Sequence, residues 1–179
     1  MANSPHLIVI GAGPGGYATA FMASDQGLDV TLIDDAPNPG GVCLYRGCIP
    51  SKALLHVARL LQETKLAREW GVRFNKPIID LDELRSWKDG VVGKMTKGLG
   101  ALSRQRKINY IQGRAKFIGP HQLIVTRDRQ QQNIRFDKAV VATGSRPARI
   151  SSLWIKSEHL MDSTGALEIP TIPSSLLVI

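Results

Sequence analysis

The stretch HLIVIGAGPGGYATAFMASDQGLDVTLID, residues 6–34, decides the fold of this 179-residue chain. Its apolar start, His6–Ile10, predicts a buried strand. The segment Pro14–Gln26 has small and apolar residues at helical spacing and stops at Gly27, which is typical of a helix. The segment Leu28–Ile33, rich in β-branched residues, predicts a second strand. Strand, helix and strand in this order predict a right-handed βαβ unit with two parallel strands.

The turn between the first strand and the helix, Gly11–Gly16, matches the pattern G-x-G-x-x-G. In a dinucleotide-binding turn the first glycine permits the tight bend, the second lets a pyrophosphate approach, and the third allows helix and strand to pack closely. Asp34 ends the second strand 23 residues after Gly11 (34 − 11), close to the spacing of an acid that binds ribose hydroxyls. No Lys or Arg stands at positions 34 and 35, which disfavours a 2′-phosphate. A glycine-rich turn without a ligand is the alternative.

The two cysteines of the chain, Cys43 and Cys48, lie in the segment GGVCLYRGCIPSK, residues 40–52. Two cysteines with the nearby His56 fall short of the four ligands of a structural zinc site. A structural disulfide is disfavoured inside a reducing cell. Inert buried thiols are the ordinary alternative, and a redox-active pair is the interpretation that the surrounding residues favour.

The spacing of the pair restricts its geometry. Residues five apart in a regular helix have Cα atoms about 8–9 Å apart, whereas a disulfide requires less than about 7 Å. A Cys43–Cys48 bridge therefore has to straddle a distorted helix start, and Gly40, Gly41, Gly47 and Pro50 can supply the distortion. Lys52 follows Cys48 by four residues on the same helix face, where a cation can steady a thiolate; an ordinary surface lysine is the alternative.

The periodicity of the rest of the chain predicts two long helices and then short strands. The helices are expected at 51–69, with Leu54, Leu55, Ala58, Leu61 and Leu66 on the inner face, and at 81–106, weakened by Gly90, Gly93, Gly98 and Gly100. The strands are expected at 108–112, 115–118, 122–126, 134–136 and 138–142. The last of these ends in Thr143-Gly144-Ser145, at the sheet edge where ligands of open α/β sheets bind. Asp162 is expected to cap a short helix.

Composition narrows the classes of function. The formal net charge is +8 and 21% of the residues are charged, but the basic residues are scattered, which disfavours nucleic-acid binding. No apolar run approaches the roughly 20 residues that cross a bilayer. The short polar start lacks the pattern of a secretory signal, so a cytoplasmic protein without membrane attachment is expected.

The C-terminal residues predict a further domain. Leu176–Ile179 is apolar and follows Pro170 and Pro173, as expected of a buried strand that has just begun. The expected division is a first domain at 1–150, a linker with a short helix at 151–173, and the first strand of a second domain at 174–179.

These motifs stand in one order that resembles a known family. Gly11-x-Gly13-x-x-Gly16, Cys43-x4-Cys48-x3-Lys52 and Ala142-Thr143-Gly144-Ser145 resemble the FAD domain of the class I pyridine nucleotide–disulfide oxidoreductases. The cysteine segment is most similar to the dihydrolipoamide dehydrogenase group. The resemblance implies an α/β fold: a Rossmann-like FAD-binding domain with a parallel central sheet, a helical hairpin insertion and a small antiparallel β-meander.

The resemblance also implies a role for each matching residue. Cys43 would be the interchange thiol that exchanges with the substrate, Cys48 the charge-transfer thiol against the flavin, and Lys52 a neighbour of flavin N5. Asp34 would hold the adenosine ribose, and the backbone at Ala115 would meet the adenine. The residues expected along the FAD pyrophosphate and the rest of the cofactor are Gly11, Gly13, Pro14, Gly15, Gly16, Thr143, Gly144 and Ser145. No metal is implied.

The implied activity is the FAD- and NAD-dependent oxidation of dihydrolipoamide by a homodimer that serves a 2-oxoacid dehydrogenase complex through its lipoyl domain. The NAD site is expected beyond this chain, as is the general-base histidine, because none of the four histidines matches it. The chain alone is therefore expected to bind FAD at most and to be inactive. The alternatives are another disulfide or mercuric reductase, or a non-catalytic FAD-binding segment. The family usually has Glu where Asp34 stands, and Tyr45-Arg46 replaces a more usual Asn-Val pair.

Overall fold

The computed structural model describes residues 5–153 and 155–179 and divides the chain into two compact units. The first unit comprises residues 1–45 and 94–146, and the second comprises residues 46–93 and 147–179. The predicted domain boundaries at 150 and 173 remain a prediction, since the units group residues that are separated in the sequence.

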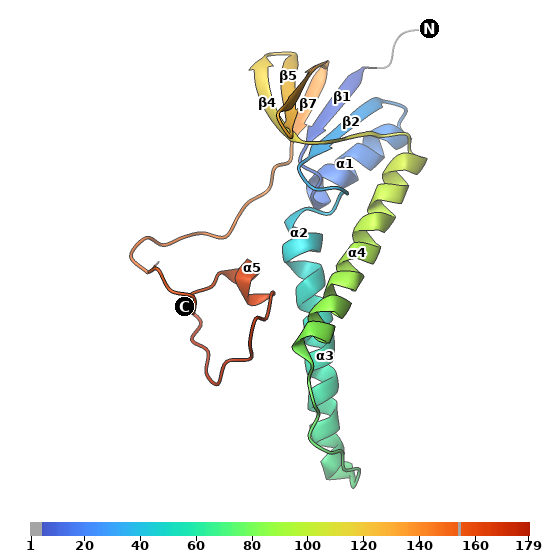
Figure 1. Cartoon of the computed structure of the whole chain (residues 1–179). Helices are drawn as coiled ribbons and strands as arrows, with labels where there is room; N and C mark the ends of the chain where they lie inside the picture. Colours follow the sequence, from blue (N-terminus) through green and yellow to red (C-terminus); the bar gives the residue numbers. More distant parts are fainter. Residues whose placement is uncertain (1–4, 154) are drawn as a thin grey trace. The chain divides into compact units, whose positions relative to one another are not determined.

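The first unit is built on a parallel sheet of four strands in the order β3-β2-β1-β7 (Figure 1). The strands are β1 (His6–Ile10), β2 (Asp29–Asp34), β3 (Asn109–Gln112) and β7 (Lys138–Val141). All neighbouring pairs are parallel. This is the strand order of one half of a Rossmann fold. The chain places β2 and β3 on one side of β1 and then returns to place β7 on the other side.

Side chains alternate between the two faces of the sheet along β1 and β2, and apolar residues are buried on both faces. Leu7 and Val9 pack with Leu32 against α1 (Pro14–Asp25). Ile8 and Ile33 point to the other face and pack against the antiparallel meander. Both strands therefore carry nearly continuous apolar runs, as strands buried on two sides must.

The meander consists of β4 (Arg114–Gly119), β5 (Gln122–Arg127) and β6 (Gln130–Arg135), in that order. The turn Pro120–His121 joins β4 to β5, as the sequence predicts. Strand β5 is central, and its buried residues Leu123 and Val125 face Ile8 and Ile33 of the parallel sheet. Predicted strands and observed strands agree within a few residues, except that β6 begins four residues earlier than expected.

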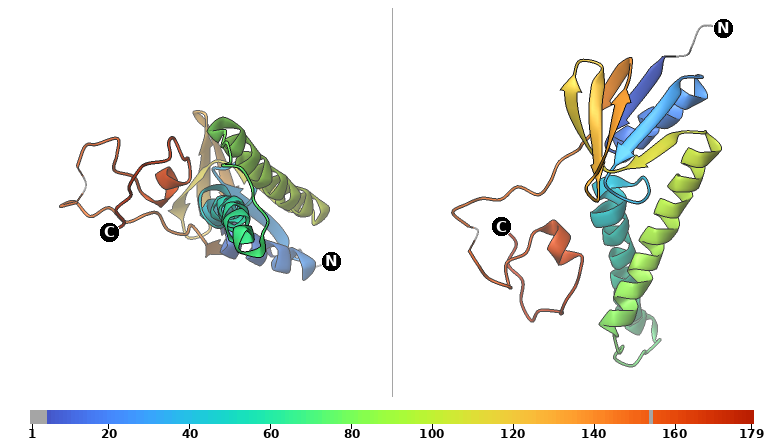
Figure 2. Two further views of the ribbon diagram at one scale, coloured as in Figure 1. Left: turned by 90° about the horizontal axis from the view of Figure 1, so that it is seen from below. Right: turned by 45° about the horizontal axis from the view of Figure 1, so that its top comes forward.

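The second unit contains a helical hairpin and the irregular segment 147–179. Helix α3 (Cys48–Leu66) continues into a short 3₁₀ turn, η1 (Ala67–Trp70), and returns as α4 (Leu81–Gln105). Residues 94–105 of α4 belong to the first unit. The views of Figure 2 show α3 and the first half of α4 side by side, and the rings of His56 and Trp87 stack with centroids 6.5 Å apart. Helix α4 extends unbroken through the four glycines that were expected to weaken it.

The expected inner face of α3 is wrong in part, and the expected strand at 174–179 is not formed; the assignment of these residues to a further domain remains a prediction. Helix α3 buries Pro50 and Ala53, whereas Leu55 and Leu66, which were expected inside, are exposed. Residues 174–179 form no strand, and Leu176–Ile179 are exposed, because a strand requires hydrogen bonds from a neighbour. The short helix α5 (Ser163–Ala166) is present, and Asp162 caps it by accepting the N–H groups of Thr164 and Gly165 at 3.0 Å each.

Candidate FAD and redox site

The carboxyl ends of β1, β2 and β7 hold the glycine-rich turn in place. The N–H of Gly11 donates to the carbonyl of Ile33 and the N–H of Ala142 to that of Ile10, both at 2.7 Å. Gly11 has φ +96°, and a Cβ there would overlap the carbonyl oxygen of Ala142 and lie 3.0 Å from the Cα of Thr143. Only glycine can occupy this position. The segment Thr143–Ser145, which follows β7, therefore begins directly beside the turn.

Helix α1 begins in a way that suits a bound anion. Its first residue is Pro14, and Gly13 at the N-cap provides no side-chain cap among the described residues. The first N–H groups of a helix have no partner within the helix and carry its positive dipole end. A Cβ on Gly15 would meet nothing within 4 Å, while one on Gly16 would overlap the carbonyl of Gly11. The open N–H groups and the close strand–helix approach fit a pyrophosphate.

The carboxylate of Asp34 is drawn to this turn. Its Oδ2 accepts the N–H of Ala12 at 2.6 Å, and its Oδ1 accepts the N–H of Ala36 at 2.9 Å. A carboxylate has about four acceptor positions, so these two bonds orient Asp34 and leave room for ribose hydroxyls. Asp34, which is shorter than the Glu usual in the family, is thus held by backbone N–H groups at the end of β2.

A tyrosine on β3 binds the loop that follows Asp34. The hydroxyl of Tyr110, on β3, donates to the carbonyl of Ala36 at 2.8 Å. Burial, with the negative charge of Asp34 as a second cause, raises the pKa of Tyr110 far above its usual value. The phenol therefore stays protonated and keeps donating. Sequence reasoning missed Tyr110, since an aromatic residue on a strand is usually part of the core.

The loop from β2 to the cysteines also touches the turn. The N–H of Gly40 donates to the carbonyl of Ala12 at 2.8 Å. Gly41 has φ +58°, and a Cβ there would overlap the Cα of Gly13. This contact between Gly13 and Gly41 was also missed, although the glycine pair directly before Cys43 was the available signal.

The two cysteines occupy two different helices. Cys43 is half-buried in α2 (Gly41–Arg46), and Cys48 is exposed as the first residue of α3. Gly47 separates the helices with φ −148° and ψ −105°. The prediction that the pair cannot share one regular helix is confirmed at the level of the backbone. Lys52 lies in the first two turns of α3 and is exposed.

Ala115 lies near the ribose end of the predicted site. The N–H of Gly113 donates to the carbonyl of Asp34 at 2.8 Å, which brings the start of β4 beside the end of β2. Ala115 pairs with Val125 and is half-buried against the core. The first unit therefore brings together the glycine-rich turn, Asp34, the start of β4 and the segment Thr143–Ser145.

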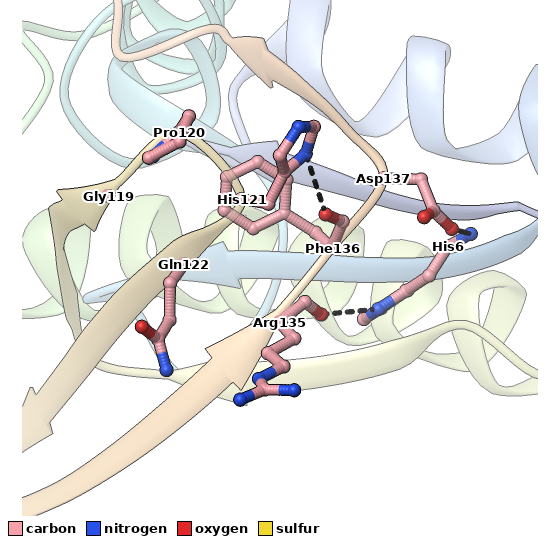
Figure 3. A pocket seen from close by; sticks show the side chains of 8 residues that line it. All are labelled: His6, Gly119, Pro120, His121, Gln122, Arg135, Phe136 and Asp137. Carbon is pink, nitrogen blue, oxygen red and sulfur yellow. Dashed lines mark hydrogen bonds between the residues drawn. The ribbon is translucent and has the colours of Figure 1, made fainter.

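A cavity of about 660 Å³ lies at the opposite edge of the sheet, where β1 begins (Figure 3). It is lined by His6, Gly119, Pro120, His121, Gln122, Arg135, Phe136 and Asp137. Both ring nitrogens of His6 are engaged: Nδ1 donates to the carbonyl of Arg135, and Nε2 lies 2.9 Å from the hydroxyl of Thr31. None of the residues predicted to bind the cofactor lines this cavity.

Within the described residues, no three His, Cys, Asp or Glu side chains are grouped so that they could hold a metal ion. None of the helices in the same part of the chain has the length and apolar character needed to cross a bilayer.

Comparison with known proteins defines the class. The chain belongs to the family described as pyridine nucleotide-disulphide oxidoreductase, whose model matches residues 5–179. Within this family it is similar to dihydrolipoyl dehydrogenases: 42% identical over 172 residues to that of Vibrio cholerae and 44% identical over 173 residues to that of Buchnera aphidicola from Acyrthosiphon pisum. These matches cover 96% and 97% of this chain, which spans 36% and 37% of the relatives' length.

A solved structure supports the fold. An HOCl-induced flavoprotein disulfide reductase from Escherichia coli, determined as a Cu(II) complex, superposes with a TM-score of 0.73 and 26% identity. The match covers 92% of this chain and 34% of that one. The predicted Rossmann-like FAD-binding fold and the predicted family resemblance are both confirmed.

Proposed function

We propose that this chain is the FAD-binding part of a dihydrolipoyl dehydrogenase, with Cys43 and Cys48 as its redox-active pair. The observation that carries the proposal is the contact of Gly41 with Gly13: the helix bearing Cys43 begins on the turn that suits a pyrophosphate. Cys43 lies in the first turn of this helix, two residues after Gly41 (43 − 41), and would therefore be close to a cofactor bound along the glycine-rich turn. The similarity to dihydrolipoyl dehydrogenases supports the substrate.

The residues of the first unit would hold the cofactor. The N–H groups at the start of α1 would bind the pyrophosphate, Asp34 the adenosine ribose and the backbone near Ala115 the adenine. Thr143, Gly144 and Ser145 would line its path, and Lys52 of the second unit would stand near the flavin. When bound, the FAD supplies two-electron transfer between the thiol pair and NAD⁺.

The cysteines would carry the first half-reaction. A thiolate of dihydrolipoamide attacks the Cys43 sulfur of the Cys43–Cys48 disulfide, and Cys48 leaves as a thiolate. The second substrate thiol then displaces Cys43 from the mixed disulfide. Lipoamide is released with its ring disulfide closed, and two electrons and two protons remain on the enzyme. NAD⁺ takes up the two electrons with one of these protons, and the other proton is released.

The experiment measures flavin content and free thiols in the full-length protein. We expect about one FAD per chain and two additional titratable thiols per chain after mild reduction with dithiothreitol. Cys43→Ser and Cys48→Ser variants should retain FAD but show no additional thiols on reduction. A protein purified with FAD whose thiol count does not change on reduction would refute the redox assignment, and failure to bind FAD would refute the whole proposal.

Two finer assignments are part of the same proposal. The segment Ile49-Pro50-Ser51-Lys52-Ala53-Leu54-Leu55 favours dihydrolipoamide over glutathione disulfide or Hg²⁺ as the substrate. Turnover of the full-length protein with each of the three decides between them. We also propose that it acts as a cytoplasmic homodimer on the lipoyl domain of a 2-oxoacid dehydrogenase complex, and that the 179 residues alone do not turn over dihydrolipoamide and NAD⁺.

A further inference from the structure

The loop between Asp34 and the cysteine helix is held by hydrogen bonds from several elements. Gln112 donates from its Nε2 to the carbonyl of Asp35 at 3.0 Å, and Tyr110 donates to that of Ala36 at 2.8 Å. The N–H of Gly40 donates to Ala12 in the glycine-rich turn. The first half of the loop is therefore tied to β3, and its end is tied to the turn.

The remaining bond comes from the cysteine helix itself. The hydroxyl of Tyr45, the fifth residue of α2, donates to the carbonyl of Asn38 at 3.0 Å. Its ring lies over Gly40, where a Cβ would be 3.1 Å from the Tyr45 Cε2. Tyr45 thus bends back over the entrance of its own helix and clamps the loop from which that helix starts.

Helix α2 needs such anchoring. It has six residues, and helices this short are unstable without tertiary contacts. It is also held by the buried side chain of Leu44, 5% exposed, and by the contact of Gly41 with Gly13. Cys43 lies between the start of the helix and Leu44, so its position depends on how firmly this short helix is held.

We propose that Tyr45 is a positioning residue for Cys43: its hydroxyl bond to Asn38 and its ring on Gly40 hold α2 against the glycine-rich turn. This inference rests on the proposed redox function of Cys43. It assigns a role to a position where the chain departs from the Asn-Val pair that its family resemblance leads one to expect. Loss of the hydroxyl should let α2 open more often, which exposes the half-buried Cys43 and misaligns it for exchange.

The test compares the full-length protein with its Tyr45→Phe and Tyr17→Phe variants. The control variant Tyr17→Phe also removes a tyrosine hydroxyl, but Tyr17 lies outside this loop. Its ring packs on Phe21 with centroids 5.7 Å apart. Each protein is reduced and treated with iodoacetamide, and mass spectrometry follows alkylation of Cys43 and Cys48 separately. FAD content, the melting temperature and dihydrolipoamide turnover are measured on the same samples.

In Tyr45→Phe we expect Cys43 to be alkylated about three- to tenfold faster, the range that corresponds to one net hydrogen bond. Turnover should fall by a similar factor. Alkylation of Cys48, FAD content and the Tyr17→Phe protein should stay within about twofold of the unchanged protein. Faster alkylation of Cys43 with an unchanged melting temperature and unchanged FAD content is the signature of positioning, because general loosening would lower both. Cys48 is already exposed and serves as the internal reference.

Two results would overturn the inference. One is an unchanged rate of Cys43 alkylation in Tyr45→Phe, and the other is a parallel rise at Cys43 and Cys48 with a lower melting temperature. The alkylation rates report on α2 even if the protein proves inactive with dihydrolipoamide. Failure of the proposed function is therefore distinguishable from failure of the positioning role.

Discussion

The two units differ in how their apolar residues are used. In the first unit, Ile8, Val9, Leu32 and Leu123 are completely buried between α1, the parallel sheet and the meander. In the second unit, apolar side chains lie on the surface of the described chain: Leu55, Leu60, Trp70, Phe74 and Ile78 are all more than half exposed.

This difference teaches where stability resides in the chain. Each fully buried aliphatic side chain contributes about 1.5–3 kcal/mol relative to the exposed state, so the first unit carries most of the free energy of folding. The same unit holds the glycine-rich turn, Asp34 and Cys43. Matched substitutions in the two units should therefore have very different effects.

The largest effect is expected from a glycine. Gly16→Ala places a Cβ inside the carbonyl of Gly11, so α1 must move away from β1. We expect the free energy of unfolding to fall by about 4 kcal/mol or more, in the upper range for single substitutions, with loss of bound FAD. The control is Gly90→Ala on α4, where a Cβ meets nothing within 4 Å. It should stabilise by up to about 1 kcal/mol. Equal melting temperatures for the two variants would contradict the contrast.

A buried leucine comes next. Leu32→Ala removes a side chain that is 0% exposed in the sheet core and should cost about 3 kcal/mol in urea denaturation, as large-to-small core substitutions do. Leu60→Ala on α3, where the leucine is 55% exposed, should change stability by less than about 0.5 kcal/mol. A comparable loss at Leu60 would show that the hairpin is covered in the folded protein.

A smaller effect is expected at Asp34, the acid proposed to bind the ribose. Asp34→Asn leaves one oxygen to serve the N–H groups of Ala12 and Ala36, and it removes the charge from both bonds. We expect a loss of about 2 kcal/mol in stability, typical of hydrogen bonds to a charged group, together with weaker FAD binding by fluorescence titration. The exposed neighbour supplies the control: Asp35→Asn should leave both quantities nearly unchanged, and an equal loss there would contradict the assignment.

The smallest effect depends on pH. Tyr110→Phe should cost about 1 kcal/mol at pH 7, because it removes the bond to Ala36. The pKa of Tyr110 is raised by folding, so its contribution is complete below the unfolded pKa of about 10. As the pH rises above that value, the unfolded chain ionises first and the contribution is lost. Denaturation at pH 7 to 11 should therefore show the difference between Tyr110→Phe and the unchanged protein shrinking above pH 10. A constant difference would rule this out.

Sequence reasoning succeeded where the signal is local. The βαβ unit appears with almost the predicted bounds because its apolar alternation, glycine turn and helix stop lie within 29 consecutive residues, 6–34. The cap at Asp162 also depends only on its neighbours in the chain. The inner face of α3 was wrong, since helical periodicity identifies an apolar stripe but not the surface that will cover it.

The amino-acid sequence by itself determined the Rossmann-like fold, the glycine-rich turn and the separation of Cys43 from Cys48 by a glycine break, because each depends on backbone preferences of nearby residues. Only the tertiary structure decided that Gly41 rests on Gly13, that Tyr110 binds the loop that follows Asp34 and that Tyr45 clamps the start of its own helix. The first two contacts, Gly41 with Gly13 and Tyr110 with Ala36, join segments 28 and 74 positions apart (41 − 13 and 110 − 36). The contact of Tyr45 with Asn38 requires the loop to fold back onto the helix, which no local pattern of residue types predicts. Such contacts arise from packing in three dimensions, which a one-dimensional pattern of residue types does not specify.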